Sequence, residues 1–153
     1  VLIKGMALFE EVKVSGKVSF LKAQFRGWLT KFNRSNFEDN ADFRHSSYTS
    51  RAEFDEIDFV GNTDFSRAYF HKDVGFHKTS FRKDAYFEAV SFDGQVGFRG
   101  SKTNGVNIYF SDVSFVDTPI TFLESDLTGF KFDRLKWPKK QIKIFKNKIS
   151  TYN

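Results

Sequence analysis

The chain contains no cysteine among its 153 residues. A disulfide framework, a thiolate nucleophile and a Cys-ligated zinc or iron–sulfur site are therefore excluded. Long apolar runs are also missing, since none approaches the roughly 18 to 20 residues that a membrane span needs. The opening residues 1–11 are too short and too charged for a signal peptide. These absences argue against a membrane role for this segment, and we expect a soluble, cytoplasmic protein.

Residue types that carry catalysis or bind metals are scarce. The chain has three histidines, His45, His71 and His77, and the repeat register derived below stacks none of them directly on another. No nucleophile-elbow sequence surrounds the serines, and the glycines of residues 94–105 fit no phosphate-binding loop. We therefore expect no enzymatic activity, no metal site and no cofactor.

Charge of one sign is unevenly distributed. Residues 1–34 carry seven Lys/Arg against two acids, and residues 131–153 carry eight against one. Residues 35–130 carry nine basic and sixteen acidic residues. An acidic body thus lies between two basic ends.

Phenylalanine is the residue that the chain has in excess, with 21 copies. Between residues 37 and 98 an aromatic residue returns in alternating steps of six and five, and a small or β-branched residue precedes most of them by two positions. The aromatic series is Phe37, Phe43, Tyr48, Phe54, Phe59, Phe65, Phe70, Phe76, Phe81, Phe87, Phe92 and Phe98. The unit is therefore eleven residues long with two unequal halves, which is typical of a repeat architecture.

An eleven-residue period also occurs in right-handed coiled coils, but this pattern does not suit a helix. At 100° per residue, Ala68, Phe70 and Phe76 would point at roughly 0°, 200° and 80°, which is not a stripe. Within triplets such as residues 63–65 the first and third residues share one face, as extended backbone requires. Polar turn residues follow each triplet, so the pattern favours short strands joined by turns.

This pattern resembles the pentapeptide-repeat family, whose unit has a central Phe or Leu and a small residue two positions earlier. The resemblance covers residues 20–132, and the chain departs from the simplest pattern by adding one residue to every second unit. It implies an all-β fold, a right-handed quadrilateral parallel β-helix in which four units form one coil, here of 22 residues. It also implies a non-catalytic module of bacterial type.

A 22-residue coil predicts four vertical stacks of rings. One stack comprises Phe32, Phe54, Phe76 and Phe98, a second Phe37, Phe59 and Phe81, a third Tyr48, Phe70 and Phe92, and a fourth Phe43, Phe65, Phe87 and Tyr109. At position 103 the rhythm requires an aromatic residue but the chain has Thr103. Either Thr103 faces inward or a short loop bulges outward there.

Both ends of a solenoid need covers, because no coil can bury its own rings. We expect residues 1–19 to form an N-terminal cap, and Trp28 to fill a corner in the irregular step from Phe25 to Phe32. In residues 133–153, a basic C-terminal tail, Ile142, Phe145 and Ile149 recur at helical spacing. They predict a short capping helix that covers the last coil or mediates a homodimer.

For function we expect a binding or scaffold module that acts through protein–protein interaction. Nucleic-acid binding is disfavoured because the aromatic residues are committed to the core. One candidate contact is the irregular stretch that contains Arg99, Ser101, Lys102 and Asn104, since projecting loops often carry function. The other is the acidic cluster of Glu53, Asp55, Glu56 and Asp58. The alternative is a DNA-mimicking modulator of DNA gyrase, a role that the family resemblance implies for some members.

Overall fold

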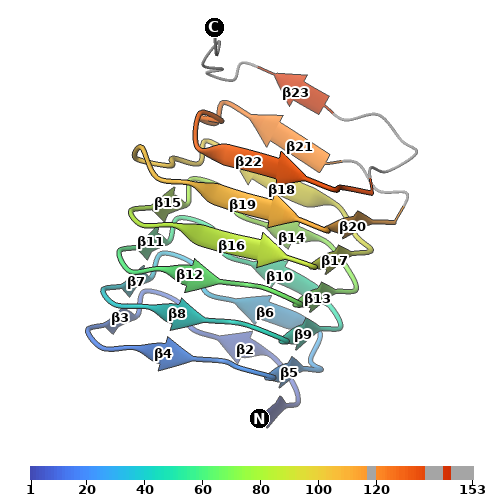
Figure 1. The fold of residues 1–153 in the computed structure, drawn as a ribbon. Helices are drawn as coiled ribbons and strands as arrows, with labels where there is room; N and C mark the ends of the chain where they lie inside the picture. Colours follow the sequence, from blue (N-terminus) through green and yellow to red (C-terminus); the bar gives the residue numbers. More distant parts are fainter. Residues whose placement is uncertain (117–119, 137–142, 146–153) are drawn as a thin grey trace, which may run out of the picture.

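The structure is a computed structural model that describes residues 1–116, 120–136 and 143–145. Within those residues the regular elements are short strands, β1 to β23, and there is no helix. Figure 1 shows the chain passing from β4 at the front to β5 at the right, β6 at the back and β7 at the left, and returning to the front as β8 one level higher. The chain therefore winds right-handed around four faces, as predicted.

We name the faces A to D in the order in which the chain meets them. Face A consists of β1 (Leu2–Ile3), β5 (Gln24–Phe25), β9 (Ser47–Tyr48), β13 (Tyr69–Phe70), β17 (Ser91–Phe92) and β20 (Ser114–Phe115). Face B consists of β2 (Ala7–Leu8), β6 (Leu29–Lys31), β10 (Arg51–Glu53), β14 (Val74–Gly75), β18 (Val96–Arg99), β21 (Ile120–Leu123) and β23 (Lys143–Phe145). Face C consists of β3 (Lys13–Val14), β7 (Asn36–Phe37), β11 (Asp58–Phe59) and β15 (Ser80–Phe81). Face D consists of β4 (Val18–Ser19), β8 (Ala41–Asp42), β12 (Thr63–Asp64), β16 (Ala85–Glu88), β19 (Ile108–Ser111) and β22 (Phe130–Asp133).

Each strand pairs in parallel with the strands one coil below and one coil above. Thr63 lies between Ala41 and Ala85, which are 22 residues away in each direction. The N–H of Phe65 donates to the carbonyl of Tyr86 at 2.8 Å, so hydrogen bonds run along the solenoid axis. The predicted 22-residue coil is confirmed for the body of the chain.

The core consists of four columns of stacked rings that also touch one another edge to face. Phe32, Phe54, Phe76 and Phe98 are fully buried, with successive ring centroids 4.9, 5.2 and 5.0 Å apart. These separations match the strand spacing of about 4.8 Å, because each ring rides on the strand that carries it. The stacks on Phe37 and Tyr48 also form as predicted.

The prediction for the fourth stack is wrong at its last member. Phe87 stacks on Phe110 at 4.7 Å, whereas Tyr109 points outward and stacks on Tyr86. The coil between them has 23 residues, since Ala85 pairs with Ile108. Thr103 faces inward and is fully buried, and a turn at Asn104 and Gly105, both with positive φ, holds the additional residue. Thr103 therefore faces inward, and a tight turn that bonds back to the coil below, rather than a projecting loop, accommodates the additional residue.

The corners explain why the repeat has unequal halves. In each five-residue step the second residue after the aromatic has positive φ, as in His45, Glu56 and Arg67, at 56°, 59° and 60°. The following N–H then bonds back to the aromatic carbonyl, as from Ala68 to Phe65 at 2.9 Å. This left-handed residue makes a tight corner, and the six-residue step turns the next corner with one more residue.

The solenoid begins earlier than the sequence indicates. Residues 1–19 contain β1 to β4, which pair in register with β5 to β8. Phe9 stacks on Phe32 at 4.7 Å and Phe20 stacks on Phe43 at 5.2 Å. The segment expected as a cap is thus a first coil with the same architecture as the body.

The predicted C-terminal helix is not confirmed. Lys143–Phe145 form the strand β23, which pairs with β21 in parallel, so Phe145 belongs to a strand. A strand extends the ladder of face B, which a helix would have ended. Ile142 and Ile149 lie outside the described residues.

Candidate interaction surface

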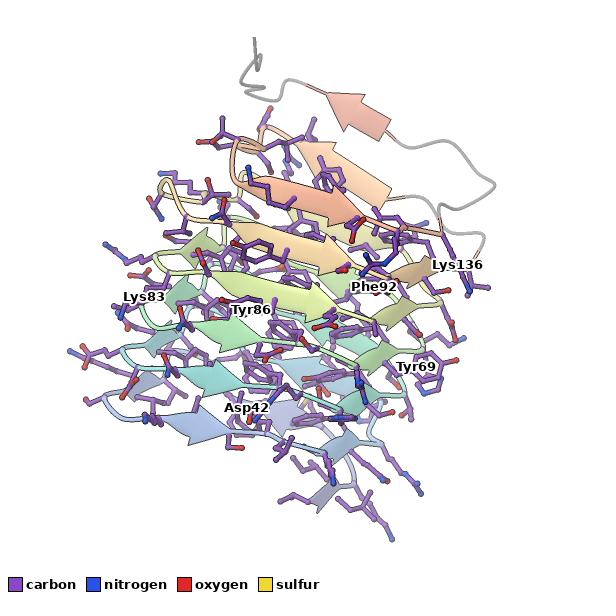
Figure 2. The ribbon with its side chains drawn as sticks, in the orientation of Figure 1. Asp42, Tyr69, Lys83, Tyr86, Phe92 and Lys136 are labelled. Atoms are coloured by element: carbon purple, nitrogen blue, oxygen red, sulfur yellow. The ribbon has the colours of Figure 1, made fainter. Side chains whose placement is uncertain are left out.

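Function on this fold has to come from the outward positions, because stacked rings fill the interior. In a strand such as β12, Thr63 points inward and Asp64 outward. Figure 2 shows Asp42 and Tyr86 on the front face and Tyr69 at the right-hand face. Outward residues therefore form columns along the axis, in which each residue neighbours another about 22 positions away in the chain.

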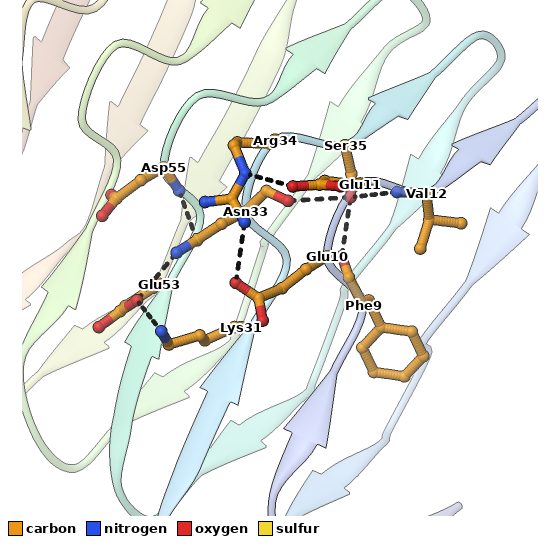
Figure 3. Close-up of polar contacts among 10 residues, drawn as sticks. All are labelled: Phe9, Glu10, Glu11, Val12, Lys31, Asn33, Arg34, Ser35, Glu53 and Asp55. Carbon is orange, nitrogen blue, oxygen red and sulfur yellow. Dashed lines mark hydrogen bonds and ion pairs between the residues drawn. The ribbon is translucent and has the colours of Figure 1, made fainter.

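The four acids of the predicted cluster lie around the corner between faces B and C rather than on one face. Glu53 points outward from β10 and contacts Lys31 at 3.5 Å and Asn33 at 2.9 Å (Figure 3). It also lies 3.0 Å from Arg51 of the same strand. Asp58 lies on face C, where Arg82 binds it through two nitrogens at 2.7 and 2.8 Å. The corner separates the two carboxylates, and each is partly neutralised by its cation.

The other two acids of that cluster lie at the corner itself. Glu56 is the exposed left-handed residue. Asp55 is half-buried: its N–H donates to Asn33 Oδ1 at 3.1 Å, and its Oδ1 accepts the N–H of His77 at 2.9 Å. Burial raises the pKa of the Asp55 carboxyl, and the His77 N–H opposes that effect. Asp55 is therefore part of the corner's hydrogen bonding more than of an open acidic surface.

A ladder of side-chain acceptors runs along this corner and was missed in the sequence. Asn33 accepts the N–H of Asp55, Asp55 that of His77, and His77 Nδ1 that of Arg99 at 3.2 Å. The signal was available, because an Asn, Asp or His recurs one position after the aromatic at 22-residue spacing. The ladder satisfies backbone donors where the strand ends at a turn.

The stretch at residues 99–105 does not project as a loop. Ser101 is buried and its hydroxyl donates to the Phe76 carbonyl, so it has no surface on which to meet a partner. Lys102 continues the strand ladder beside Ser80 and stays exposed. Asn104 is exposed and donates to Ser80 Oγ at 2.8 Å. Arg99 is exposed and lies 3.9 Å from Glu124.

Face B has a shallow hollow in which two glycines take the place of outward side chains. Gly75 and Gly97 occupy successive outward positions, and the His77 ring lies over both, because a Cβ at Gly97 would overlap His77 Cε1. With Nδ1 accepting the Arg99 N–H, the neutral ring carries its proton on Nε2. The glycines are thus explained by the packing of the protein's own imidazole.

Face A carries Ser47, His71 and Asp93 in the order of a hydrolytic triad. Ser47 Oγ lies 3.4 Å from His71 Nε2, and His71 Nδ1 lies 3.9 Å from Asp93 Oδ2. The Tyr69 hydroxyl, however, donates to the same carboxylate oxygen at 2.7 Å. The backbone N–H groups of Ser47, His71 and Asp93 all donate to carbonyls of the coil below, so none serves as an oxyanion donor. The cluster is better suited to a rigid polar surface than to acyl transfer.

Residues 1–116, 120–136 and 143–145 contain neither a metal-binding cluster nor a membrane-spanning helix. There, no group of three or more His, Asp or Glu side chains is placed to hold a metal ion. In the same residues no helix has the length and apolar character required to cross a membrane.

No family model and no curated protein matches the chain. Among solved structures it is similar to HetL, a pentapeptide repeat protein involved in heterocyst differentiation regulation from the cyanobacterium Nostoc sp. strain PCC 7120. That similarity covers 88% of this chain and 84% of HetL at 11% identity, with a TM-score of 0.18, which is too low to support an argument by itself. The likeness to this family rests instead on the coil. A parallel four-faced solenoid with 22-residue turns and Phe-centred units fits a pentapeptide-repeat protein.

Proposed function

We propose that this chain is a non-catalytic scaffold that binds a protein partner through the outer faces of its solenoid. The proposal rests on the difference between inward and outward positions of the strands. Inward positions hold the stacked rings, and outward positions hold polar and charged side chains in fixed columns. A partner surface that matches such columns is recognised without any change in the core.

Ion pairs between coils support this proposal. Arg82 binds Asp58, and Arg134 binds Asp112 through two nitrogens, both at 2.9 Å. Both arginines are well exposed, so solvent screens each pair and it contributes little to stability. Their main effect is to orient charges at a fixed spacing, which favours specificity in binding.

The test uses cross-linking and mass spectrometry on the full chain in lysate of the source cell. A scaffold gives a reproducible protein partner whose cross-links fall on outward residues. Reversing a contacted charge should abolish capture and leave the free energy of unfolding within about 0.5 kcal/mol of the parent. The proposal fails if no partner is captured, or if capture is lost only in variants that unfold.

The second candidate is the gyrase-modulating DNA mimic. It is favoured by Asp42 and Asp64, which are register neighbours on face D. Asp84 belongs to the next coil, directly before β16. This candidate is opposed by Arg44, which lies 2.9 Å from Asp42 and 3.9 Å from Asp64, and by Tyr86, which follows Asp64 in the column. A supercoiling assay decides: inhibition or protection of gyrase that Asp64→Lys abolishes would favour this candidate.

A further inference from the structure

An exposed tryptophan sits in a one-residue insertion of the second coil. Phe25 pairs with Tyr48, 23 positions later, whereas Leu29 pairs with Arg51, 22 positions later. One residue is therefore added between Phe25 and Leu29, where Trp28 lies. Trp28 is 68% exposed and does not fill a corner, contrary to the sequence-based expectation. The ring stacks of the core are complete without it.

Exposed apolar side chains lie on face B next to the residue that follows Trp28. Ala7 pairs with Thr30, so Met6 lies beside Leu29, the residue after Trp28. Met6 is 44% exposed and Leu8, two positions further along the face, is 47% exposed. These residues point sideways from the rod, and a patch with a large exposed aromatic marks an interaction site more often than a bare surface.

Two cations border the same patch across the corner to face A. Leu2 pairs with Gln24 and Ile3 with Phe25, so Lys4 lies beside Arg26, whose N–H donates to the Ile3 carbonyl at 2.9 Å. Among the residues that the structure describes, neither side chain has an acidic partner. Like charges on neighbouring strands repel, and an anion bound between them would remove that repulsion.

The geometry points to an occupant with both kinds of group. We propose that this surface, the Trp28 strip of Lys4, Met6, Leu8, Arg26, Trp28 and Leu29, docks a polypeptide segment that carries carboxylates next to apolar side chains. Carboxylates would meet the two cations, and the apolar side chains would cover the indole and the aliphatic patch. The inference rests on the proposed scaffold function and names the partner's chemistry.

A peptide fits this strip better than a lipid surface or a nucleic acid. The strip wraps around the corner between faces A and B, and a flat bilayer cannot follow that corner. A single indole beside aliphatic side chains offers one stacking platform, whereas binding of single-stranded nucleic acid relies on successive aromatic platforms.

The experiment selects random phage-displayed peptides on the immobilised full chain and measures the affinity of synthetic copies. The selected peptides are expected to combine Asp or Glu with aromatic or aliphatic residues. Trp28→Ser and the pair Lys4→Glu and Arg26→Glu should each weaken binding by at least about tenfold. Val116→Ser and Lys72→Glu, exposed residues elsewhere on the solenoid, are the matched controls and should leave affinity unchanged.

The outcomes separate this inference from the proposed function. Peptides that bind the parent and Trp28→Ser equally, peptides without acidic residues, or no enrichment would overturn it. Trp28-dependent binding of single-stranded oligonucleotides or anionic phosphatidylserine vesicles, with no peptide enrichment, would reassign the strip. If a protein partner is captured from lysate and Trp28→Ser retains it fully, the scaffold function stands and the Trp28 strip is not its site.

Discussion

Removing one ring from the middle of the core tests the stacking directly. In Phe76→Ala the lost side chain is fully buried and lies 5.2 Å from Phe54 and 5.0 Å from Phe98 in its own stack. It also makes edge-to-face contacts with Phe65 and Phe87, both at 5.5 Å. The substitution therefore opens a cavity bordered by rings from three coils.

The expected loss is large because the cavity cannot close. The strands above and below are held at the hydrogen-bonding distance by the backbone ladder, so neighbouring rings cannot collapse into the space. A buried Phe→Ala typically costs about 3–5 kcal/mol, and each lost aromatic pair contributes about 0.5–1.5 kcal/mol beyond area burial. We expect the upper part of that range, about 4–5 kcal/mol.

The assay is urea unfolding followed by far-ultraviolet circular dichroism. Tyr86→Ala serves as the control, because Tyr86 faces outward on face D and stacks with Tyr109 at 5.3 Å. We expect it to lose about 1 kcal/mol. A loss below about 1 kcal/mol for Phe76→Ala, or equal losses for the two variants, would refute the conclusion that stacked rings hold the core together.

Three further predictions test buried polarity, corner strain and pH dependence. Thr63 Oγ1 is buried with no hydrogen-bond partner among the described residues. Thr63→Val should therefore raise the free energy of unfolding, measured in urea, by about 1 kcal/mol. A lower free energy of unfolding would mean that the hydroxyl has a partner. Ala89 is exposed with a φ of 53°, a conformation that glycine adopts more easily, so Ala89→Gly should stabilise the protein by about 0.5 kcal/mol. Ala85→Gly, within β16, should destabilise it. Thermal melts that rank the two variants the other way would contradict the corner geometry. Burial raises the pKa of Asp55, so the folded protein loses stability as the pH rises through the folded pKa and the carboxyl ionises. Asp55→Asn should therefore be more stable than the parent at neutral pH, and this difference in stability should vanish in acid. The hydrogen bond from Arg44 lowers the pKa of Asp42, so Asp42→Asn should lose stability at neutral pH and match the parent in acid; parallel pH profiles for the two variants would contradict this assignment.

The regular part of the fold was predictable from the sequence. An aromatic every five or six residues with a small residue two positions earlier allows alternating inward positions only in short extended segments. With four units in each coil, as the family resemblance implies, parallel coils that stack in register place ring partners 22 residues apart, as for Phe54 and Phe76. Where the count changes by one residue, the arithmetic fails, as it does at Tyr109 and Phe110.

The candidate site was much less predictable. Glu53 and Asp58 are close in sequence but lie on different faces, because the chain turns a corner at Glu56. Glu56 has a positive φ although it is not a glycine, so the sequence did not indicate this corner. Ser101 looked like part of a loop, yet its hydroxyl satisfies the Phe76 carbonyl inside the core.

The sequence by itself determined the eleven-residue repeat and the identity of nearly every buried ring, since periodicity is a local property that burial must obey. The four faces and the 22-residue coil followed from the family resemblance. The tertiary structure alone decided which outward side chains meet where a coil departs from 22 residues. Met6 comes to lie beside Leu29, 23 positions later, and Trp28 is left exposed, because an inserted residue shifts the register by one after Phe25. Such neighbours are separated by about one coil of chain and depend on the sum of every turn between them, which no local pattern records.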